Sequence, residues 1–337
     1  MRILVVGAGA TGGYFGARLI QAGREVTFLV RPARAAQLRA TGLRVRTPRE
    51  QLWFEPRLVT AANLDSSYDL LLLAVKAYSL RAAARELTAA VGPRSLILPL
   101  LNGMRHLEIL AGRFGDRAVL GGLCQLTTVT EPDGTICQLN ERHELVYGPR
   151  QATPPALLAE AAAALASSRF VARQSGDILA EMWAKWVHVA AVGALTCLMR
   201  ATVGEVIAVA RGAAFAERVL AECAAVAAAA GHPIEPAALA ATRATITEPG
   251  SPAATSLYRD LIEHREVESE QVIGDLVDRA AVLGVPVPLL ELVRIHLEVY
   301  QAGLPTTAGA AAQRQGTTSA RVPEFRSATG PTPARPS

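Results

Sequence analysis

The sequence contains very little lysine: only Lys76 and Lys185 of its 34 basic residues are not arginine. Arginine stays charged in proteins, whereas a buried lysine can lower its pKa and exchange a proton. A chain that uses arginine for almost every positive charge therefore marks both lysines as candidate functional residues. Lys185 is the more unusual of the two, because it opens one of the most apolar runs of the chain, EMWAKWVHVAAVGALTCLM (181–199).

Aromatic residues and cysteines are also scarce. Aromatic residues make up 5% of the chain while half of it is apolar, so the core must consist mainly of Ala, Leu and Val. The cysteines lie in apolar or strand-like segments without the spacing of metal ligands, at Cys124, Cys137, Cys197 and Cys223. This pattern excludes a disulfide framework and predicts no metal site. We expect reduced thiols in a cytoplasmic protein.

Long runs of charge or of apolar residues are missing. No block of like charges occurs, and much of the net charge of +4 comes from the end of the chain, where four arginines follow Gly303 against the single Glu324. We therefore expect no nucleic-acid partner. The apolar run after Lys185 is shorter than the ~20 residues that cross a bilayer, so we expect no membrane span. The N-terminal apolar run leads directly into a glycine motif, which is not typical of a signal peptide.

The first half of the sequence alternates between strands and helices. Apolar runs predict strands at 2–7, 25–30, 69–75 and 95–101. Strands that are apolar on both faces and separated by helices are typical of a parallel sheet covered on both sides. Hairpin strands are predicted over 43–60, and further short strands over 118–148 around a turn at Pro132-Asp133-Gly134.

The second half is Ala-rich and helical from about Pro154, apart from a short strand near Phe170. We predict an α/β fold, in which a Rossmann-type doubly wound parallel sheet is followed by an all-helical domain. The predicted domains are a nucleotide-binding domain (1–175), a helical substrate and dimerisation domain (176–302) and a tail (303–337). The tail is rich in Gly, Ala, Thr, Pro and Ser, so we expect it to be disordered.

A G-x-G-x-x-G motif lies between the first predicted strand and helix, at Gly7-Ala8-Gly9-Ala10-Thr11-Gly12. Gly7 permits a tight turn, Gly9 lets the backbone approach a pyrophosphate, and Gly12 lets the helix pack closely on the strand. The helix N-terminus offers free N–H groups to the phosphates. The strand-to-helix context favours a dinucleotide site over a tight turn without a ligand.

The end of the second strand indicates which dinucleotide binds. NAD-binding proteins place an Asp or Glu there, whereas this chain reads Leu29-Val30-Arg31-Pro32-Ala33-Arg34. A guanidinium matches a 2′-phosphate in charge and in bidentate geometry. The sequence therefore predicts NADP(H), with Arg31 as the phosphate ligand. Arg34 is either a second ligand or a solvated helix residue.

Lys76 and Asn102 each follow a predicted strand directly. The carboxyl ends of parallel strands are where ligands of open α/β sheets bind. Both side chains are therefore candidates for contacting the cofactor and the substrate. The alternatives are that Lys76 caps the sheet edge and that Asn102 is a turn residue before Gly103.

Several segments in this order resemble the ketopantoate reductase (2-dehydropantoate 2-reductase) family: VVGAGATGGYFGARL, VKAY, LLNGM, MWAKW and SLYRDLIEHREVE. The resemblance extends from Met1 to about Gln301. It implies NADPH-dependent reduction of 2-dehydropantoate to pantoate, on the route to pantothenate and coenzyme A. By resemblance, Lys185 is the general acid, Glu268 contacts that lysine or the substrate, and Ser256 contacts the substrate. Lys76 and Asn102 line the cleft.

The chemistry agrees with this role for Lys185. Hydride transfer to a ketone builds negative charge on oxygen, which a nearby ammonium group stabilises and then protonates. Desolvation by Trp183 and Trp186 would lower the lysine pKa, and a carboxylate would raise it. The alternative is an ordinary helix lysine that pairs with Glu181 or extends to solvent.

The sequence departs from the family on the substrate side. Family members often carry asparagines where this chain has Val189 and Gly193, and a further one near Ala253. His188 is either a replacement substrate contact or a core histidine. These departures leave open a reductase of another 2-oxo acid or a hydroxyacid dehydrogenase, and a non-catalytic NADP(H)-binding sensor. The helical half is a candidate homodimer face.

Overall fold

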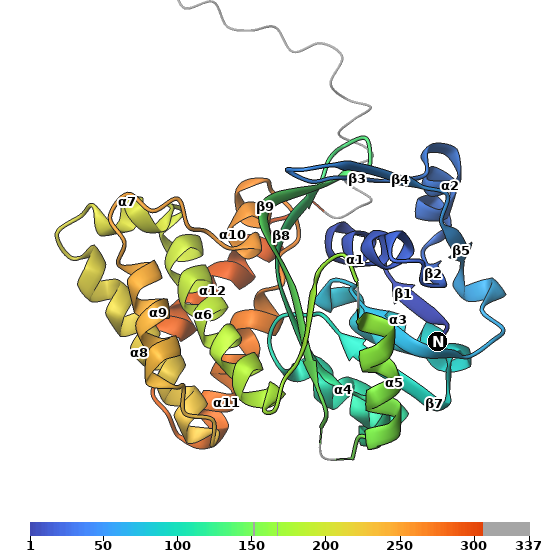
Figure 1. Cartoon of the computed structure of the whole chain (residues 1–337). Helices are drawn as coiled ribbons and strands as arrows, with labels where there is room; N and C mark the ends of the chain where they lie inside the picture. The colour runs from blue at the N-terminus through green and yellow to red at the C-terminus, as the bar shows by residue number, and fades with distance from the viewer. Residues whose placement is uncertain (151, 167, 306–337) are drawn as a thin grey trace, which may run out of the picture.

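The structure is a computed structural model that describes residues 1–305 except 151 and 167. The predicted tail therefore lies outside the described residues from position 306 onward. Figure 1 shows a half that is built around strands, in blue and green, and a half that is built of helices, in yellow to red.

A parallel sheet forms the centre of the first half, with the strand order β5-β2-β1-β6-β7. All of its neighbouring strands pair in parallel, so their carboxyl ends share one edge. The strands are β1 (Ile3–Val6), β2 (Val26–Leu29), β5 (Arg57–Val59), β6 (Tyr68–Leu73) and β7 (Val91–Pro99).

Both faces of this sheet are covered. Successive side chains of a strand point to opposite faces, so each strand contributes to two cores. Leu4 and Val6 of β1 belong to a core shared with α3, α4 and the helical half. Ile3 and Val5 belong to a second core with α1, α5 and a second sheet. The helices of this half are α1 (Ala10–Gln21), α2 (Pro32–Thr41), α3 (Leu80–Glu86), α4 (Arg105–Phe114) and α5 (Pro155–Leu165).

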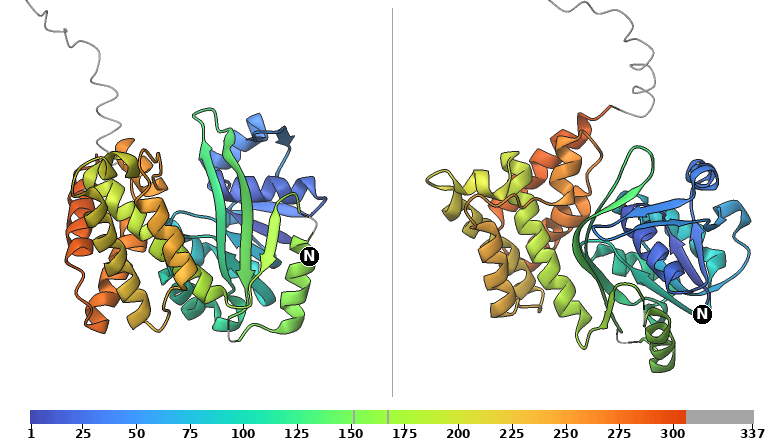
Figure 2. Two further views of the ribbon diagram at one scale, coloured as in Figure 1. Left: turned by 60° about the vertical axis from the view of Figure 1, so that its left-hand side comes forward. Right: turned by 45° about the horizontal axis from the view of Figure 1, so that its top comes forward.

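The second sheet has the order β10-β9-β3-β4, with β8 paired to β9. Its long hairpin of β8 and β9 lies between the parallel sheet and the helical half (Figure 2), and α6 contacts β8. The strands are β3 (Leu43–Arg46), β4 (Gln51–Phe54), β8 (Gly121–Thr130), β9 (Ile136–Gly148) and β10 (Val171–Gln174).

The helical half surrounds α6 (Ile178–Met199), whose first turn is capped by Asp177 accepting a hydrogen bond from the Ala180 N–H at 3.0 Å. By length and composition α6 could cross a membrane, but 67% of its most apolar window is buried inside the fold, as in a core helix. The helices around it are α7 (Val203–Ile207), α8 (Gly212–Ala229), α9 (Pro236–Ile246), α10 (Ser256–Ile262), the π-helix η5 (Glu270–Gly274), α11 (Asp275–Leu283) and α12 (Pro288–Ala302).

The predicted fold class, a doubly wound parallel sheet followed by a helical half, is confirmed. Two local predictions differ from the structure. Residues 57–59 do not extend the hairpin but pair in parallel with β2. The region 118–148 forms two long strands instead of several short ones, because β8 pairs with β9 across a single register shift.

Candidate active site

The glycine loop joins β1 to α1. Gly7 has a φ of +94°, and a Cβ atom on Gly12 would lie 2.1 Å from the Gly7 carbonyl oxygen. The space beside Gly9 is open, since a Cβ atom there would meet nothing within 4 Å. No side chain caps α1 and its first turn has no acidic residue, so its N–H groups are available to an anion. The loop therefore fits the pyrophosphate of a dinucleotide.

A cleft of about 450 Å³ lies beside this loop. Ala10, Thr11 and Gly12 form the first turn of α1 and are not among the residues lining the cleft. The glycine-loop and polar residues that line it are Gly7, Ala8, Gly9, Arg31, Arg34, Lys76, Tyr78, Ser79, Glu86 and Thr130.

The two arginines after β2 have different surroundings. Arg31 is exposed and donates to the Ser79 hydroxyl at 3.0 Å. Arg34 donates through Nε and Nη2 to the Ala8 carbonyl oxygen at 3.2 and 3.0 Å, and through Nη1 to Gln37. Arg34 is thus not a fully solvated helix residue, because three of its N–H groups hold the glycine loop and Gln37. Arg31 keeps an accessible guanidinium in the cleft.

Lys76 joins the two halves of the molecule. It follows β6, and its Nζ atom lies 2.9 Å from Asp260 Oδ2 on α10 and 3.1 Å from Glu268 Oε2. Burial acts to lower the pKa of Lys76, but the two carboxylates outweigh it and raise that pKa above its ordinary value. Glu268 also accepts the Ala77 N–H at 2.7 Å. The ion pairs therefore connect the cofactor cleft to the helical half.

Lys185 lies in a different pocket, together with Asn102. Its ammonium group donates to the Cys124 carbonyl oxygen at 2.9 Å. The pocket has a volume of about 10 Å³, room for about one water molecule. Apart from the two polar side chains, its lining is apolar or glycine: Leu101, Gly103, Gly122, Leu123, Met182, Trp186 and Val189.

The carboxylates near Lys185 in the sequence have other partners. Glu181 pairs with Arg173 at 2.6 Å, so the alternative of a Lys185–Glu181 pair is not observed. Glu268 is bound to Lys76 and Ala77 and makes no hydrogen bond with Lys185 among the described residues. The predicted contact between Glu268 and Lys185 or the substrate stays a prediction.

The remaining predicted substrate residues are Ser256 on α10 and His188 on α6. Ser256 is the first residue of α10 and is half-buried; the preceding Thr255 caps the helix and faces α6 near Gly193. His188 contacts the Thr242 hydroxyl at 3.2 Å through Nδ1, and burial together with the Lys185 charge lowers its pKa. The structure places His188 against α9, as in a core histidine, and outside the Lys185 pocket.

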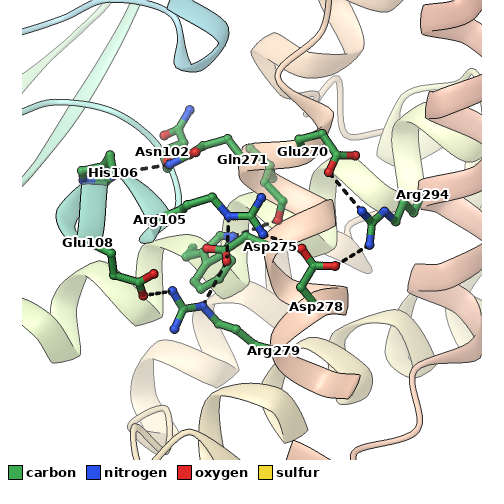
Figure 3. A network of polar contacts seen from close by, with 12 residues as sticks. Asn102, Arg105, His106, Glu108, Glu270, Gln271, Asp275, Asp278, Arg279 and Arg294 are labelled. Atoms are coloured by element: carbon green, nitrogen blue, oxygen red, sulfur yellow. Dashed lines mark hydrogen bonds and ion pairs between the residues drawn. The ribbon is translucent and has the colours of Figure 1, made fainter. Parts of the chain in front are cut away.

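Two buried polar residues behind Asn102, Gln271 and His106, have no signal in the sequence. Gln271, on the π-helix, donates through Nε2 to the Asn102 carbonyl oxygen at 3.0 Å and lies 3.2 Å from His106 Nδ1. Figure 3 shows this contact beside the ion pairs of Arg105 and Arg279. More than 160 positions separate these partners along the chain, so no local motif could have revealed them.

Within the described ranges, no group of three or more His, Cys, Asp or Glu side chains is arranged to hold a metal ion.

The sequence is similar to those of known proteins along most of its length. The family models described as "Ketopantoate reductase PanE/ApbA" and "Ketopantoate reductase PanE/ApbA C terminal" match residues 3–152 and 177–301. The uncharacterized oxidoreductase YkpB of Bacillus subtilis is 32% identical over 302 residues, 90% of this chain and 99% of the relative. The 2-dehydropantoate 2-reductase of Caulobacter vibrioides is 29% identical over 293 residues, 85% of this chain and 94% of the relative.

Solved structures share the fold as well. A PanE/ApbA family ketopantoate reductase from Ralstonia eutropha JMP134 superposes with a TM-score of 0.81 at 26% identity, covering 90% of this chain and 99% of the other. D-mandelate dehydrogenase with NADH and anilino(oxo)acetate reaches a TM-score of 0.82 at 22% identity over the same shares, a likeness of fold alone. Taken with the glycine loop and the pocket of Lys185 and Asn102, these matches show that the chain belongs to the ketopantoate reductase family of oxidoreductases.

Proposed function

We propose that the protein is an NADPH-dependent reductase of 2-oxo acids, with 2-dehydropantoate (ketopantoate) as the first candidate substrate and pantoate as its product. The observation that carries the proposal is the half-buried Lys185, which shares its pocket with Asn102 at the carboxyl edge of the parallel sheet. The relative from Caulobacter vibrioides, which bears the name of this activity, supports the choice of substrate.

Lys185 would act as the general acid. When bound, the nicotinamide cofactor would supply a hydride to the ketone carbon. The carbonyl oxygen gains negative charge as the hydride arrives, and the Lys185 ammonium stabilises that charge and transfers a proton to the same oxygen. Asn102 carries amide donors that can orient a carbonyl or carboxylate oxygen. The apolar walls, among them Trp186 and Val189, exclude water and strengthen these interactions.

Arg31 supports NADPH over NADH. It lies at the end of β2 where NAD-binding proteins place a carboxylate, and its guanidinium faces the cleft beside the Ser79 hydroxyl. A guanidinium and a hydroxyl suit a 2′-phosphate. Arg34 adds positive charge nearby, although three of its five N–H groups are already bonded to Ala8 and Gln37. The alternative is NADH, the dinucleotide named in the D-mandelate dehydrogenase structure.

A different 2-oxo acid is the second candidate substrate. Val189 and Met182 contribute apolar surface to the Lys185 pocket. The family's expected amide groups at 189 and 193 would hydrogen-bond a substrate hydroxyl, and here these positions are Val189 and Gly193. A substrate without a hydroxyl, such as a branched-chain or aromatic 2-oxo acid, would leave no donor unpaired in such a pocket.

Initial-rate oxidation of NADPH with a small substrate panel tests the proposal. The key comparison is ketopantoate against 3,3-dimethyl-2-oxobutanoate, which differs only in lacking the hydroxyl group. A site that hydrogen-bonds the hydroxyl prefers ketopantoate in kcat/KM by about 10⁴-fold, whereas an apolar pocket discriminates by about 10²-fold or less. We expect ketopantoate to have the highest kcat/KM of the panel. A higher kcat/KM for the deoxy compound or for phenylglyoxylate would support the second candidate.

The same assay decides between an enzyme and a sensor. NADPH that binds but is not oxidised with any 2-oxo acid would contradict the reductase and favour a non-catalytic NADP(H)-binding protein. Parallel rates with NADH give the cofactor preference. We also propose a cytoplasmic location, which the four free cysteine thiols support.

A further inference from the structure

Gln271 is a buried amide that connects the two halves of the molecule directly behind Asn102. The residue is only 6% exposed. One N–H of its amide points to the Asn102 carbonyl oxygen and the other to His106 Nδ1. In Figure 3 the side chain of Gln271 reaches from the helical half to both groups. Both donors of the amide are therefore used on one short segment of the first half.

His106 is the second partner of the Gln271 amide. The imidazole is fully buried, and burial, with the nearby charges of Lys185 and Arg150, lowers its pKa to about 3. The ring is therefore neutral, and one of its nitrogens is an acceptor. The Asn102 carbonyl oxygen can only accept, so the Gln271 atom beside it is the amide nitrogen, which also donates to Nδ1. The ring proton then lies on Nε2, which has no partner among the described residues.

The backbone of the π-helix provides the second contact with the site. A Cβ atom on Gly103, whose φ is +75°, would lie 2.3 Å from the Gln271 carbonyl oxygen, so this loop packs directly on the π-helix. The indole N–H of Trp186 donates to the Val272 carbonyl oxygen at 2.9 Å. Trp186 is the residue after Lys185. A π-helix offers carbonyl groups to such partners because its wider turn disrupts the α-helical pattern of hydrogen bonds.

We propose that Gln271 is a positioning residue of the reduction, acting through Asn102. Its amide and the adjacent π-helix carbonyls hold the Asn102 loop and the Lys185 helix at a fixed separation, so that both polar groups face the same substrate. This inference rests on the proposed reductase function. Positioning matters kinetically, because a misplacement of about 1 Å between reacting groups can lower the rate by about 10²-fold.

The test replaces Gln271 by Met, which keeps the approximate volume and removes both donors. We expect kcat to fall by about 10- to 100-fold, while the Kd of NADPH stays close to that of the wild type, because the cofactor cleft is lined by other residues. The deuterium isotope effect on kcat with NADPH labelled at the transferred position should rise, since hydride transfer becomes slower relative to product release. Rates are normalised to the concentration of NADPH-binding sites, so that a smaller fraction of folded protein does not lower the measured kcat.

The second variant is Gln271→Glu. Its carboxylate keeps the length and polarity of the side chain but has no N–H group to donate. Glu108→Gln is the matched control, because it removes the ion pair with Arg279 across the same interface without contacting the Asn102 loop. The control should keep the wild-type kcat and isotope effect. An unchanged kcat and isotope effect in both Gln271 variants would overturn the positioning role while the reductase stands. A wild type that reduces no 2-oxo acid would overturn both.

Discussion

The buried His106 should make the stability of the protein depend on pH between 7 and 5. The folded protein keeps this imidazole neutral because its pKa is lowered to about 3 from 6.5. The unfolded chain takes up the proton below about pH 6.5. The stabilisation is therefore present in full above pH 6.5 and is lost as the pH falls towards 3. From pH 7 to pH 5 this single group removes about 2 kcal/mol from the free energy of unfolding.

The assay is urea-induced unfolding of the wild type and of His106→Gln at both pH values. The variant keeps a carbonyl oxygen that can accept the Gln271 N–H but has no proton to titrate. His143, His188 and His296 also have lowered pKa values from burial, and their effects cancel between the two proteins. The wild type should lose about 2 kcal/mol more than the variant on acidification. Equal losses in the two proteins would refute the reasoning.

Three further predictions concern the cofactor and the reaction. Lys185→Ala should lower kcat by about 10²- to 10⁴-fold with little change in the Kd of NADPH, and a normal kcat would remove the general-acid role. In fluorescence titrations, Arg31→Ala should weaken the binding of NADPH far more than that of NADH, and equal losses would mean that Arg31 does not bind the 2′-phosphate. Arg34→Ala should weaken the binding of both dinucleotides similarly, because Arg34 holds the Ala8 carbonyl of the glycine loop. Gly12→Ala should weaken the binding of both dinucleotides and lower Tm, because the new Cβ would lie 2.1 Å from a backbone oxygen. Unchanged titrations and an unchanged Tm would show that the loop tolerates the added methyl group.

Much of the first half could be predicted because its signals are local. The apolar runs that became β1, β2, β6 and β7 are continuous, and the glycine motif lies between a strand and a helix. Lys76 and Asn102 were placed at the correct edge by the rule that parallel strands present their carboxyl ends together. The rarity of lysine pointed to Lys76 and Lys185, and the structure puts Lys76 in the cleft and Lys185 in a second pocket.

Partners far apart along the chain could not be predicted. Arg34 was ambiguous because nothing in its neighbourhood indicates that the Ala8 carbonyl would accept its hydrogen bonds. Glu268 was expected near Lys185 or the substrate, but in the structure it binds Lys76, 192 positions away. His188 was ambiguous for the same reason, because its partner Thr242 lies on α9.

The sequence by itself therefore determined the class of fold, the dinucleotide loop and the residue types able to do the chemistry, because helix and strand periodicity, glycine conformation and side-chain pKa are properties of short segments. Tertiary structure alone decided which charges neutralise one another and which polar groups face the site. Asp260 and Glu268 meet Lys76, and Gln271 meets His106, only because the helical half folds against the edge of the sheet. Those contacts depend on the packing of whole elements, which no short segment encodes.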